Sequence, residues 1–147
     1  IRTAFHMFEE AKQFPVVKQL VDIIKQDGPP DAIVAALGMQ SWSANLLFAQ
    51  SVKDCVEGGS GEISRLCVLK AATSIDDWTA GGLHSPTHPK TNSPTDCSAI
   101  ITAKDGKFVR KFPTDTTKDD GFHCDESQNV EITGDLGKGN VDPSLPY

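Results

Sequence analysis

The chain has 147 residues, an apolar fraction of 38% and a formal net charge of −6, a length that fits one domain or a piece of a larger one. Residues 1–112 hold equal numbers of acidic and basic side chains, so the acidic excess falls in residues 113–147. Because nucleic acids and anionic membranes need basic surface, we expect neither as a partner. No apolar run approaches the roughly 18 residues that span a bilayer. The chain begins at Ile1 without an initiator Met or a signal peptide, so we expect a processed or truncated product whose targeting segment has been removed.

The first elements are a short strand and a helix. Residues 1–8 alternate loosely between apolar and polar side chains, which suits a strand or extended segment. A helix follows, with Pro15 in its first turn and Gly28 and two prolines at its end. Its apolar side chains form one stripe of a 3.6-residue period: Val16, Val17, Leu20, Ile23 and Ile24.

The next segment is apolar on nearly every side and allows two interpretations. It is either a buried strand over Ala32–Leu37 leading into a helix from about Met39 to Val56, or one continuous helix with Asp31 as its N-cap. A glycine-rich turn at 58–61 ends it. The spacing of its large side chains predicts core positions for Trp42, Leu46, Leu47 and Phe48.

A third helix and a β-hairpin complete the predicted elements. The helix covers 62–75, and an irregular loop with three prolines covers 84–95. Two β-rich runs within 97–113 flank Asp105-Gly106, which is the preferred pair for a type I′ turn. In the polar tail from Thr114, only residues 129–133 could pair as a strand.

The cysteines predict disulfides. Cys55, Cys67, Cys97 and Cys124 form no C-x-x-C pair, and an even number at wide spacing fits two bridges in an exported protein. Of the three possible connectivities we favour Cys55–Cys67, which ties two helix ends across a short loop, and Cys97–Cys124, which links a strand to the segment after the hairpin.

The loop "GGLHSPTHPKTNSPTDC" raises the question of a metal site. His84 and His88 are four residues apart, and Cys97 together with the His123-Cys124 pair could complete a ligand set. Prolines surround the histidine pair, however, so no helix holds both side chains on one face. We therefore expect exposed loop histidines and no metal. A calcium loop around Gly121 fails as well, because Thr116 stands where a carboxylate is needed.

The sequence carries no catalytic signature, and we expect neither an enzyme nor a cofactor. Neither Cys55 nor Cys97 lies in a recognisable nucleophile motif, and no serine stands in a G-x-S-x-G elbow. The glycines at 58–61 lack the lysine and the strand–helix context of a phosphate-binding loop.

The order of several segments resembles a known family. "TAFHMFEE", "KQDGPPDA", "LCVLKAATSIDDWTAGGLHSPTHP", "CSAIITAKDGKFVRKFP" and "DGFHCD" follow one another as in the C-terminal third of type I periplasmic binding proteins, the branched-chain amino-acid receptors of ABC importers. The resemblance covers residues 1 to about 131. It implies an α/β fold: the C-terminal portion of two lobes joined by crossing strands, with about three helices and a hinge-crossing hairpin.

The resemblance also implies a place in the two-lobed fold for each part of the chain. It implies a hinge-crossing strand at 1–8, the helical part of lobe 1 at 9–95, a hinge-crossing hairpin and the end of lobe 2 at 96–131, and an acidic flexible tail at 132–147. Family members often place an aromatic side chain in the ligand cleft near positions 37–40. Here Met39 and Gln40 occupy that place and are the candidate ligand-binding residues, with Met39 as an ordinary core residue the alternative.

These expectations define a function and a rival. The resemblance implies a fragment of an extracytoplasmic protein that captures an amino acid-like solute for an ABC permease by hinge closure, and whose missing N-terminus could carry a lipid anchor. We expect the fragment alone to bind no solute tightly, to expose apolar helix faces and to self-associate. The rival is an independent disulfide-stapled extracellular interaction domain without a small-molecule ligand.

Overall fold

The computed structural model describes residues 1–33, 35–58, 63–91 and 93–129. Within these ranges it contains three α-helices: α1 (Pro15–Asp27), α2 (Ala36–Glu57) and α3 (Arg65–Thr73). The strands are β1 (Arg2–Thr3), β2 (Cys97–Lys104), β3 (Lys107–Phe112) and β4 (His123–Cys124). Short 3₁₀ turns are η1 (Phe8–Glu10), η2 (Asp119–Gly121) and η3 (Glu126–Gln128). The fold is thus mixed, with helices and a small antiparallel sheet.

Helix α1 confirms the sequence prediction. Pro15 occupies the first helical position and Gly28 is the C-cap. From its apolar stripe, Val17 and Leu20 are buried almost completely and anchor the main core. They pack there with Met39, Ala80 and Leu83.

Both interpretations of the segment after α1 are wrong at its start. Helix α2 begins at Ala36, with Ala35 as an N-cap that makes no side-chain hydrogen bond, so Asp31 is not the cap. Residues 36–37 are helical and residues 32–33 are not in a strand, which excludes the buried strand. The reason lies in the preceding prolines: the amide of Ala32 donates to the carbonyl oxygen of Pro29 at 2.9 Å, and this turn delays the helix.

Helix α3 is shorter than predicted. It begins after Ser64, whose hydroxyl accepts a hydrogen bond from the backbone amide of Cys67, and it ends at Thr73. It contains no buried residue. Most of the predicted glycine turn, residues 59–61, lies outside the described residues, as do the predicted tail at 132–147 and residues 130–133 of the possible strand.

The predicted hairpin is confirmed. Asp105 and Gly106 form the turn with φ values of 52° and 72°, the positive values that a type I′ turn requires. β2 is the central strand, pairing antiparallel with β1, β3 and β4. The N-terminal strand is only two residues long, because the chain then bridges to His84 through Phe5 and turns into η1.

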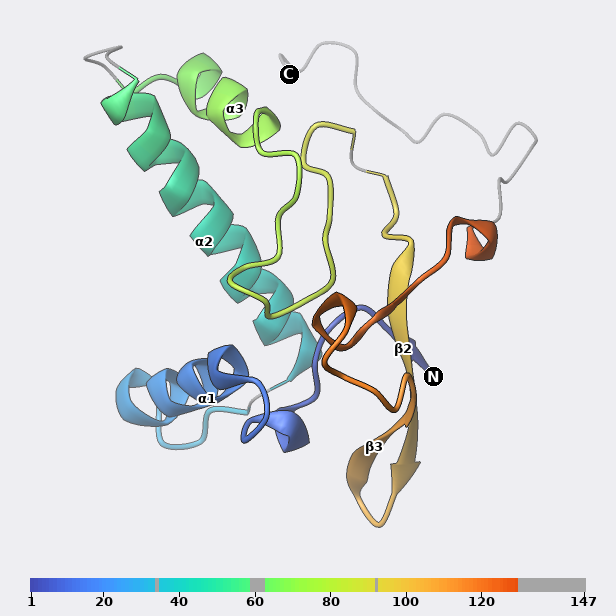
Figure 1. The fold of residues 1–147 in the computed structure, drawn as a ribbon. Coiled ribbons are helices and arrows are strands. Elements are labelled where there is room, and N and C mark those ends of the chain that lie inside the picture. Colours follow the sequence, from blue (N-terminus) through green and yellow to red (C-terminus); the bar gives the residue numbers. More distant parts are fainter. Residues whose placement is uncertain (34, 59–62, 92, 130–147) are drawn as a thin grey trace, which may run out of the picture.

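The helices and the hairpin lie on opposite sides of the N-terminal segment. Figure 1 shows α2 as a long diagonal rod with α1 beside its start and α3 beside its end, while β2 and β3 project on the other side. The N-terminal segment connects the two parts. Its strand β1 pairs with β2 of the hairpin. The segment also bonds to the loop before β2, where the amide of His6 donates to Leu83 O at 3.2 Å and that of Ser85 donates to Ala4 O at 2.8 Å. Within the described ranges, no helix combines the length and apolar character needed to cross a bilayer.

Candidate functional site

A small cavity lies where the N-terminal segment, the start of α2 and the hairpin meet. Its volume is about 270 Å³. Its lining is mostly apolar and comes from three separate parts of the chain: Ile1, Arg2, Thr3, Phe5, His6, Met7, Phe8, Ala36, Met39, Ile101 and Phe108. We call it the junction cavity. Because residues about 100 positions apart form it, its existence depends on the pairing of β1 with β2.

The structure separates the two candidate ligand-binding residues. Met39 is 3% exposed and lines the junction cavity, while its side chain also belongs to the main core. Gln40 is exposed and is not among the residues that line this cavity. Met39 therefore fits both the ligand-site and the core interpretation, and Gln40 lies away from the cavity.

A nearly buried ion pair joins η1 to β3. The guanidinium of Arg110 on β3 donates to both carboxylate oxygens of Glu10 in η1, from Nε at 2.6 Å and from Nη2 at 2.7 Å. Its Nη1 donates to the carbonyl oxygen of Gly121 at 2.6 Å. Burial raises the pKa of Glu10, but the hydrogen bonds that its carboxylate accepts, chiefly from Arg110 and also from the Met7 amide, outweigh this effect, and the pKa falls to about 2. Glu10 therefore remains ionised at any physiological pH.

His6 is enclosed beside this ion pair. Its ring stacks on Phe14 at 3.5 Å and on Phe122 at 4.5 Å between ring centroids. Its Nδ1 lies 3.3 Å from Arg110 Nη2, which can only donate, so the geometry assigns the proton of the neutral ring to Nε2. Among the described residues, Nε2 has no hydrogen-bond partner.

Gly121 makes this arrangement possible. Its φ of +82° favours glycine, and a Cβ at this position would lie 2.9 Å from the Phe14 ring. No sequence pattern identified His6, Glu10 and Arg110 as a group. The only local signal was the spacing of four between His6 and Glu10, and nothing pointed to an arginine 100 residues away.

A second buried polar group joins α2 to the loop before β2. The Ser43 hydroxyl lies 2.7 Å from His84 Nε2 and accepts a hydrogen bond from Trp78 Nε1 at 2.9 Å. His84 Nδ1 lies 2.7 Å from the carbonyl oxygen of Ser85, which fixes the proton on Nδ1. Burial lowers the pKa of His84 and outweighs the hydrogen bond to the carbonyl oxygen of Ser85, which raises it, so the neutral ring is favoured.

The contact between Ser43 and His84 has the orientation of a nucleophile and its base. Both side chains are buried, however, and their contacts hold the loop against α2. Ser43 is 6% exposed, His84 is 3% exposed, and neither lines the junction cavity. The indole of Trp78 already occupies the Ser43 oxygen. The prediction that the loop histidines are exposed is wrong for His84, because its ring supplies the polar contact that fixes the loop on α2. It fits His88, whose side chain is 43% exposed and contacts the carbonyl oxygen of Asp76.

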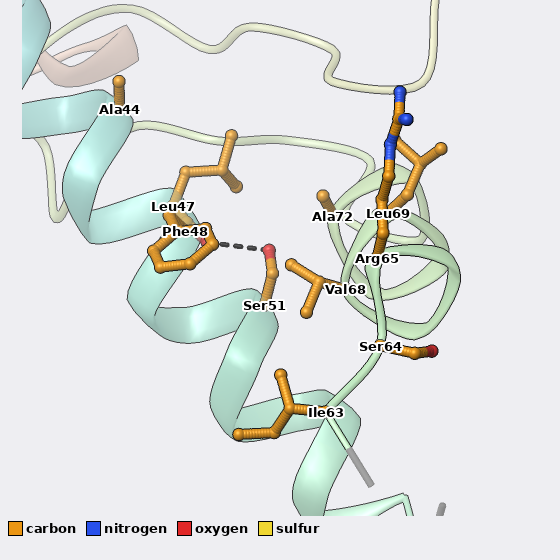
Figure 2. Close-up of a pocket in the computed structure, with 10 residues that line it drawn as sticks. All are labelled: Ala44, Leu47, Phe48, Ser51, Ile63, Ser64, Arg65, Val68, Leu69 and Ala72. Atoms are coloured by element: carbon orange, nitrogen blue, oxygen red, sulfur yellow. Dashed lines mark hydrogen bonds between the residues drawn. The ribbon is translucent and has the colours of Figure 1, made fainter. Parts of the chain in front are cut away.

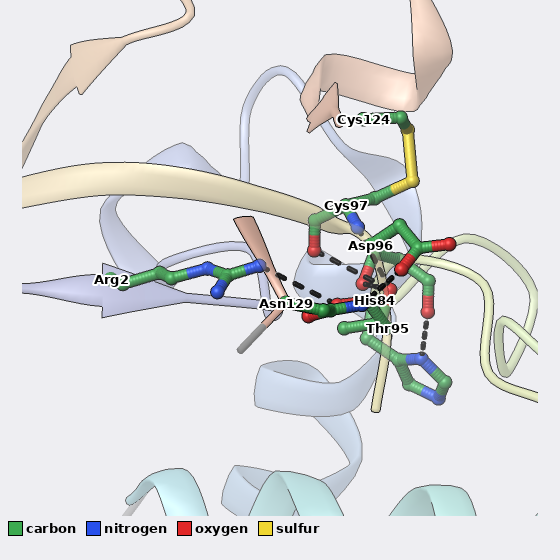
Figure 3. The surroundings of a disulfide bond; sticks show 8 residues. Arg2, His84, Thr95, Asp96, Cys97, Cys124 and Asn129 are labelled. Carbon is green, nitrogen blue, oxygen red and sulfur yellow. Dashed lines mark hydrogen bonds between the residues drawn. A yellow bond between two sulfur atoms is a disulfide. The ribbon is translucent and has the colours of Figure 1, made fainter. Parts of the chain in front are cut away.

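The four cysteines form the two bridges favoured from the sequence, Cys55–Cys67 and Cys97–Cys124. Figure 3 shows the second bridge between β2 and β4, with Thr95, Asp96 and Asn129 beside it. Both thiols of the suspected metal site are thus bonded to each other. Two disulfides indicate an oxidising, extracytoplasmic environment.

An apolar groove runs between α2 and α3, and no other described segment covers it. Its volume is about 560 Å³, and Figure 2 shows side chains from both helices facing into it. Its lining residues are Ala44, Leu47, Phe48, Ser51, Ile63, Ser64, Arg65, Val68, Leu69 and Ala72. Phe48 is 61% exposed, so its predicted core position is wrong within the described chain. Leu46, at 37%, is also exposed, whereas Trp42 packs against the main core.

Comparisons with protein-family models, with curated proteins and with solved structures found no match.

Proposed function

We propose that this chain is the C-terminal part of an extracytoplasmic solute-binding protein, similar to the type I periplasmic family, that captures an amino acid-like solute for an ABC importer. The observation that carries the proposal is the junction cavity. β1 and β2 run antiparallel beside each other at the cavity, as two strands crossing a hinge would. A pocket at a hinge is where a solute can contact both moving parts.

The uncovered groove supports the same proposal. Large apolar side chains along the groove are more than half exposed: Phe48 on α2, Ile63 just before α3 and Leu69 on α3. Contiguous apolar surface of this kind marks a contact with another part of a protein. In a two-lobed solute-binding protein, strands contributed by preceding chain would cover these helices.

The mechanism would be a population shift. A solute that contacts both lobes binds the closed form more tightly, and this difference in affinity shifts the open–closed equilibrium. The ion pair between Glu10 and Arg110 would keep the N-terminal segment and the hairpin together as one body during closure, because their contacts are almost fully desolvated. The membrane permease would then recognise the closed form.

Calorimetry tests the proposal. We expect residues 1–147 alone to give no measurable heat with leucine, isoleucine, valine or glutamate, and a longer product that includes the preceding chain to bind one of them. In that longer product, Met39→Leu should weaken binding, whereas Gln40→Ala should leave it unchanged as a matched control. Tight binding by residues 1–147 alone, or no binding by the longer product, would contradict the proposal.

The exposed groove also favours a second candidate, a disulfide-stapled extracellular interaction domain without a small-molecule ligand. Its α2–α3 face would then be the partner surface. The two candidates differ in what covers the groove, which hydrogen exchange can measure. Protection of α2 and α3 that appears only in the longer product supports the solute-binding protein, and protection that appears only with a separate partner supports the interaction domain.

A further inference from the structure

One face of the β2–β3 hairpin points away from the body of the protein. Directly paired residues of antiparallel strands share a face, and so do residues two apart along a strand. A register shift beside Ile100 leaves Lys111 unpaired at its edge. The pairings place these residues on one side, which we call the outer hairpin face: Arg2, Ile100, Thr102, Lys104, Lys107, Val109 and Phe112.

The opposite side of the hairpin is already used by the fold away from the tip, although Phe108 near the tip is 43% exposed. Ala99 is fully buried, Ile101 is 6% exposed, and the Arg110 side chain is 9% exposed in its ion pair with Glu10. The outer hairpin face has no such cover among the described residues. Figure 1 shows the hairpin projecting away from the helices, which leaves this face accessible.

The centre of the outer hairpin face is apolar. Ile100, Val109 and Phe112 are 40%, 37% and 45% exposed. The Phe112 ring meets the edge of the His123 ring at 4.9 Å, and its remaining surface is open. Three neighbouring apolar side chains on a strand pair are a surface that a partner can desolvate.

Basic side chains surround this centre. Arg2 lies at one end, Lys104 and Lys107 lie opposite each other at the other end, and Lys111 lies at the register shift. All four are exposed, and the three lysines make no ion pair with a described residue. Apart from Arg110, which is paired with Glu10 on the other side, residues 104–111 hold three basic side chains and one acidic one, in a chain whose net charge is −6. The outer hairpin face is thus a basic surface on a protein whose net charge is negative.

We propose that the outer hairpin face docks an acidic segment of another protein that carries apolar side chains. An apolar centre within a charged rim is the usual anatomy of a protein interface, and the sign of the rim selects a partner of opposite charge. The arrangement favours a polypeptide over a membrane, because the hairpin tip is the polar pair Asp105-Gly106 and the apolar residues of this face lie away from the tip. The proposal is independent of the solute-binding function.

Fluorescence anisotropy with residues 1–147 tests this docking. The probe is a short fluorescein-labelled peptide in which glutamate alternates with valine. We expect it to bind, to weaken as salt is raised, and to lose about tenfold or more in affinity when Lys104→Glu and Lys107→Glu are combined. Because these residues face each other, the double variant keeps the like-charge pair and should keep the urea midpoint. Val109→Ser should also weaken binding.

The controls separate this surface from general charge attraction. Lys90→Glu, an exposed lysine outside the hairpin, should leave the affinity unchanged. A peptide alternating glutamate with serine should bind more weakly, and one alternating lysine with valine should not bind. Equal binding by the Lys104/Lys107 variant would overturn the proposal. Preference for phosphatidylserine vesicles over the peptide, or a dimer in sedimentation that the same variant abolishes, would also overturn it.

Discussion

The two disulfides support two regions that are built in opposite ways. Cys55–Cys67 joins α2 to α3, where α3 buries no residue and the groove between the helices is open. Cys97–Cys124 joins β2 to β4, where Phe122 and Ala99 are fully packed and Arg110 connects three segments. In the first region the bridge takes the place of packing, and in the second it adds to packing. The difference indicates that only the second region is complete within the described chain.

Breaking the ion pair between Arg110 and Glu10 should lower the free energy of unfolding most, because this pair belongs to the packed region. Arg110→Met leaves the Glu10 carboxylate buried without its partner, and we expect a loss of roughly 3–5 kcal/mol in the free energy of unfolding. Urea denaturation measures it. Lys53→Met, which removes an ion pair more than half exposed on α2, should cost less than about 0.5 kcal/mol. Equal losses in the two variants would contradict the comparison.

Removing the Cys55–Cys67 bridge, in the region with the open groove, should give the second largest loss of stability. Replacing Cys55 and Cys67 by alanine releases a 12-residue loop and should lower stability by about 3 kcal/mol in the chain-entropy model. The loss should be local: hydrogen exchange should accelerate in α3 and remain slow in β2. Replacing Cys97 and Cys124 should instead accelerate exchange in β4, with the packing of Phe122 limiting the damage. Loss of protection in β2 from the first pair would show that the two regions unfold together.

Acid should weaken the packed region first. The pKa of Glu10 falls from an ordinary 4.5 to about 2, so its ionised form stabilises the fold fully above pH 4.5. That contribution, roughly 3 kcal/mol, should disappear as the pH falls from 4.5 to 2. Glu10→Gln removes the titration, so the stability difference between wild type and variant should shrink across this range. A constant difference would contradict the assignment.

A substitution in the open groove should give the smallest change in the free energy of unfolding. Phe48 is 61% exposed, so Phe48→Ser should change the free energy of unfolding by less than about 0.5 kcal/mol. Binding of a hydrophobic dye should fall at the same time, because the groove loses its largest side chain. Leu20→Ala, in the main core, should cost about 2–5 kcal/mol and serves as the contrast. A large loss from Phe48→Ser would mean that the groove is covered within residues 1–147.

Local sequence signals predicted the elements that depend on local physics. The 3.6-residue stripe gave α1, and Asp105-Gly106 gave the hairpin turn, because both require particular side chains at short spacing. The start of α2 was missed because a turn after Pro29 and Pro30 decides it, and no cap residue marks Ala36.

The sites depended on contacts that no local pattern carries. Arg110 meets Glu10 across 100 residues, and Ser43 meets His84 across 41. His84 looked like an exposed loop residue because prolines surround it. Its burial follows from the N-terminal segment, where Phe5 packs on the His84 ring at 4.9 Å. The position of Met39 next to the cavity likewise depends on where β1 pairs.

The hydrogen bond from Trp78 to Ser43 gives the protein a built-in optical probe. Trp42 and Trp78 are its two tryptophans, and both lie along one groove beside α1 and α2. Intrinsic fluorescence therefore reports whether the loop is seated on α2 and is silent on α3 and the hairpin. An unfolding curve followed by tryptophan emission alone therefore records only the separation of the loop from α2. A second probe placed on the hairpin would show whether the hairpin unfolds at the same time.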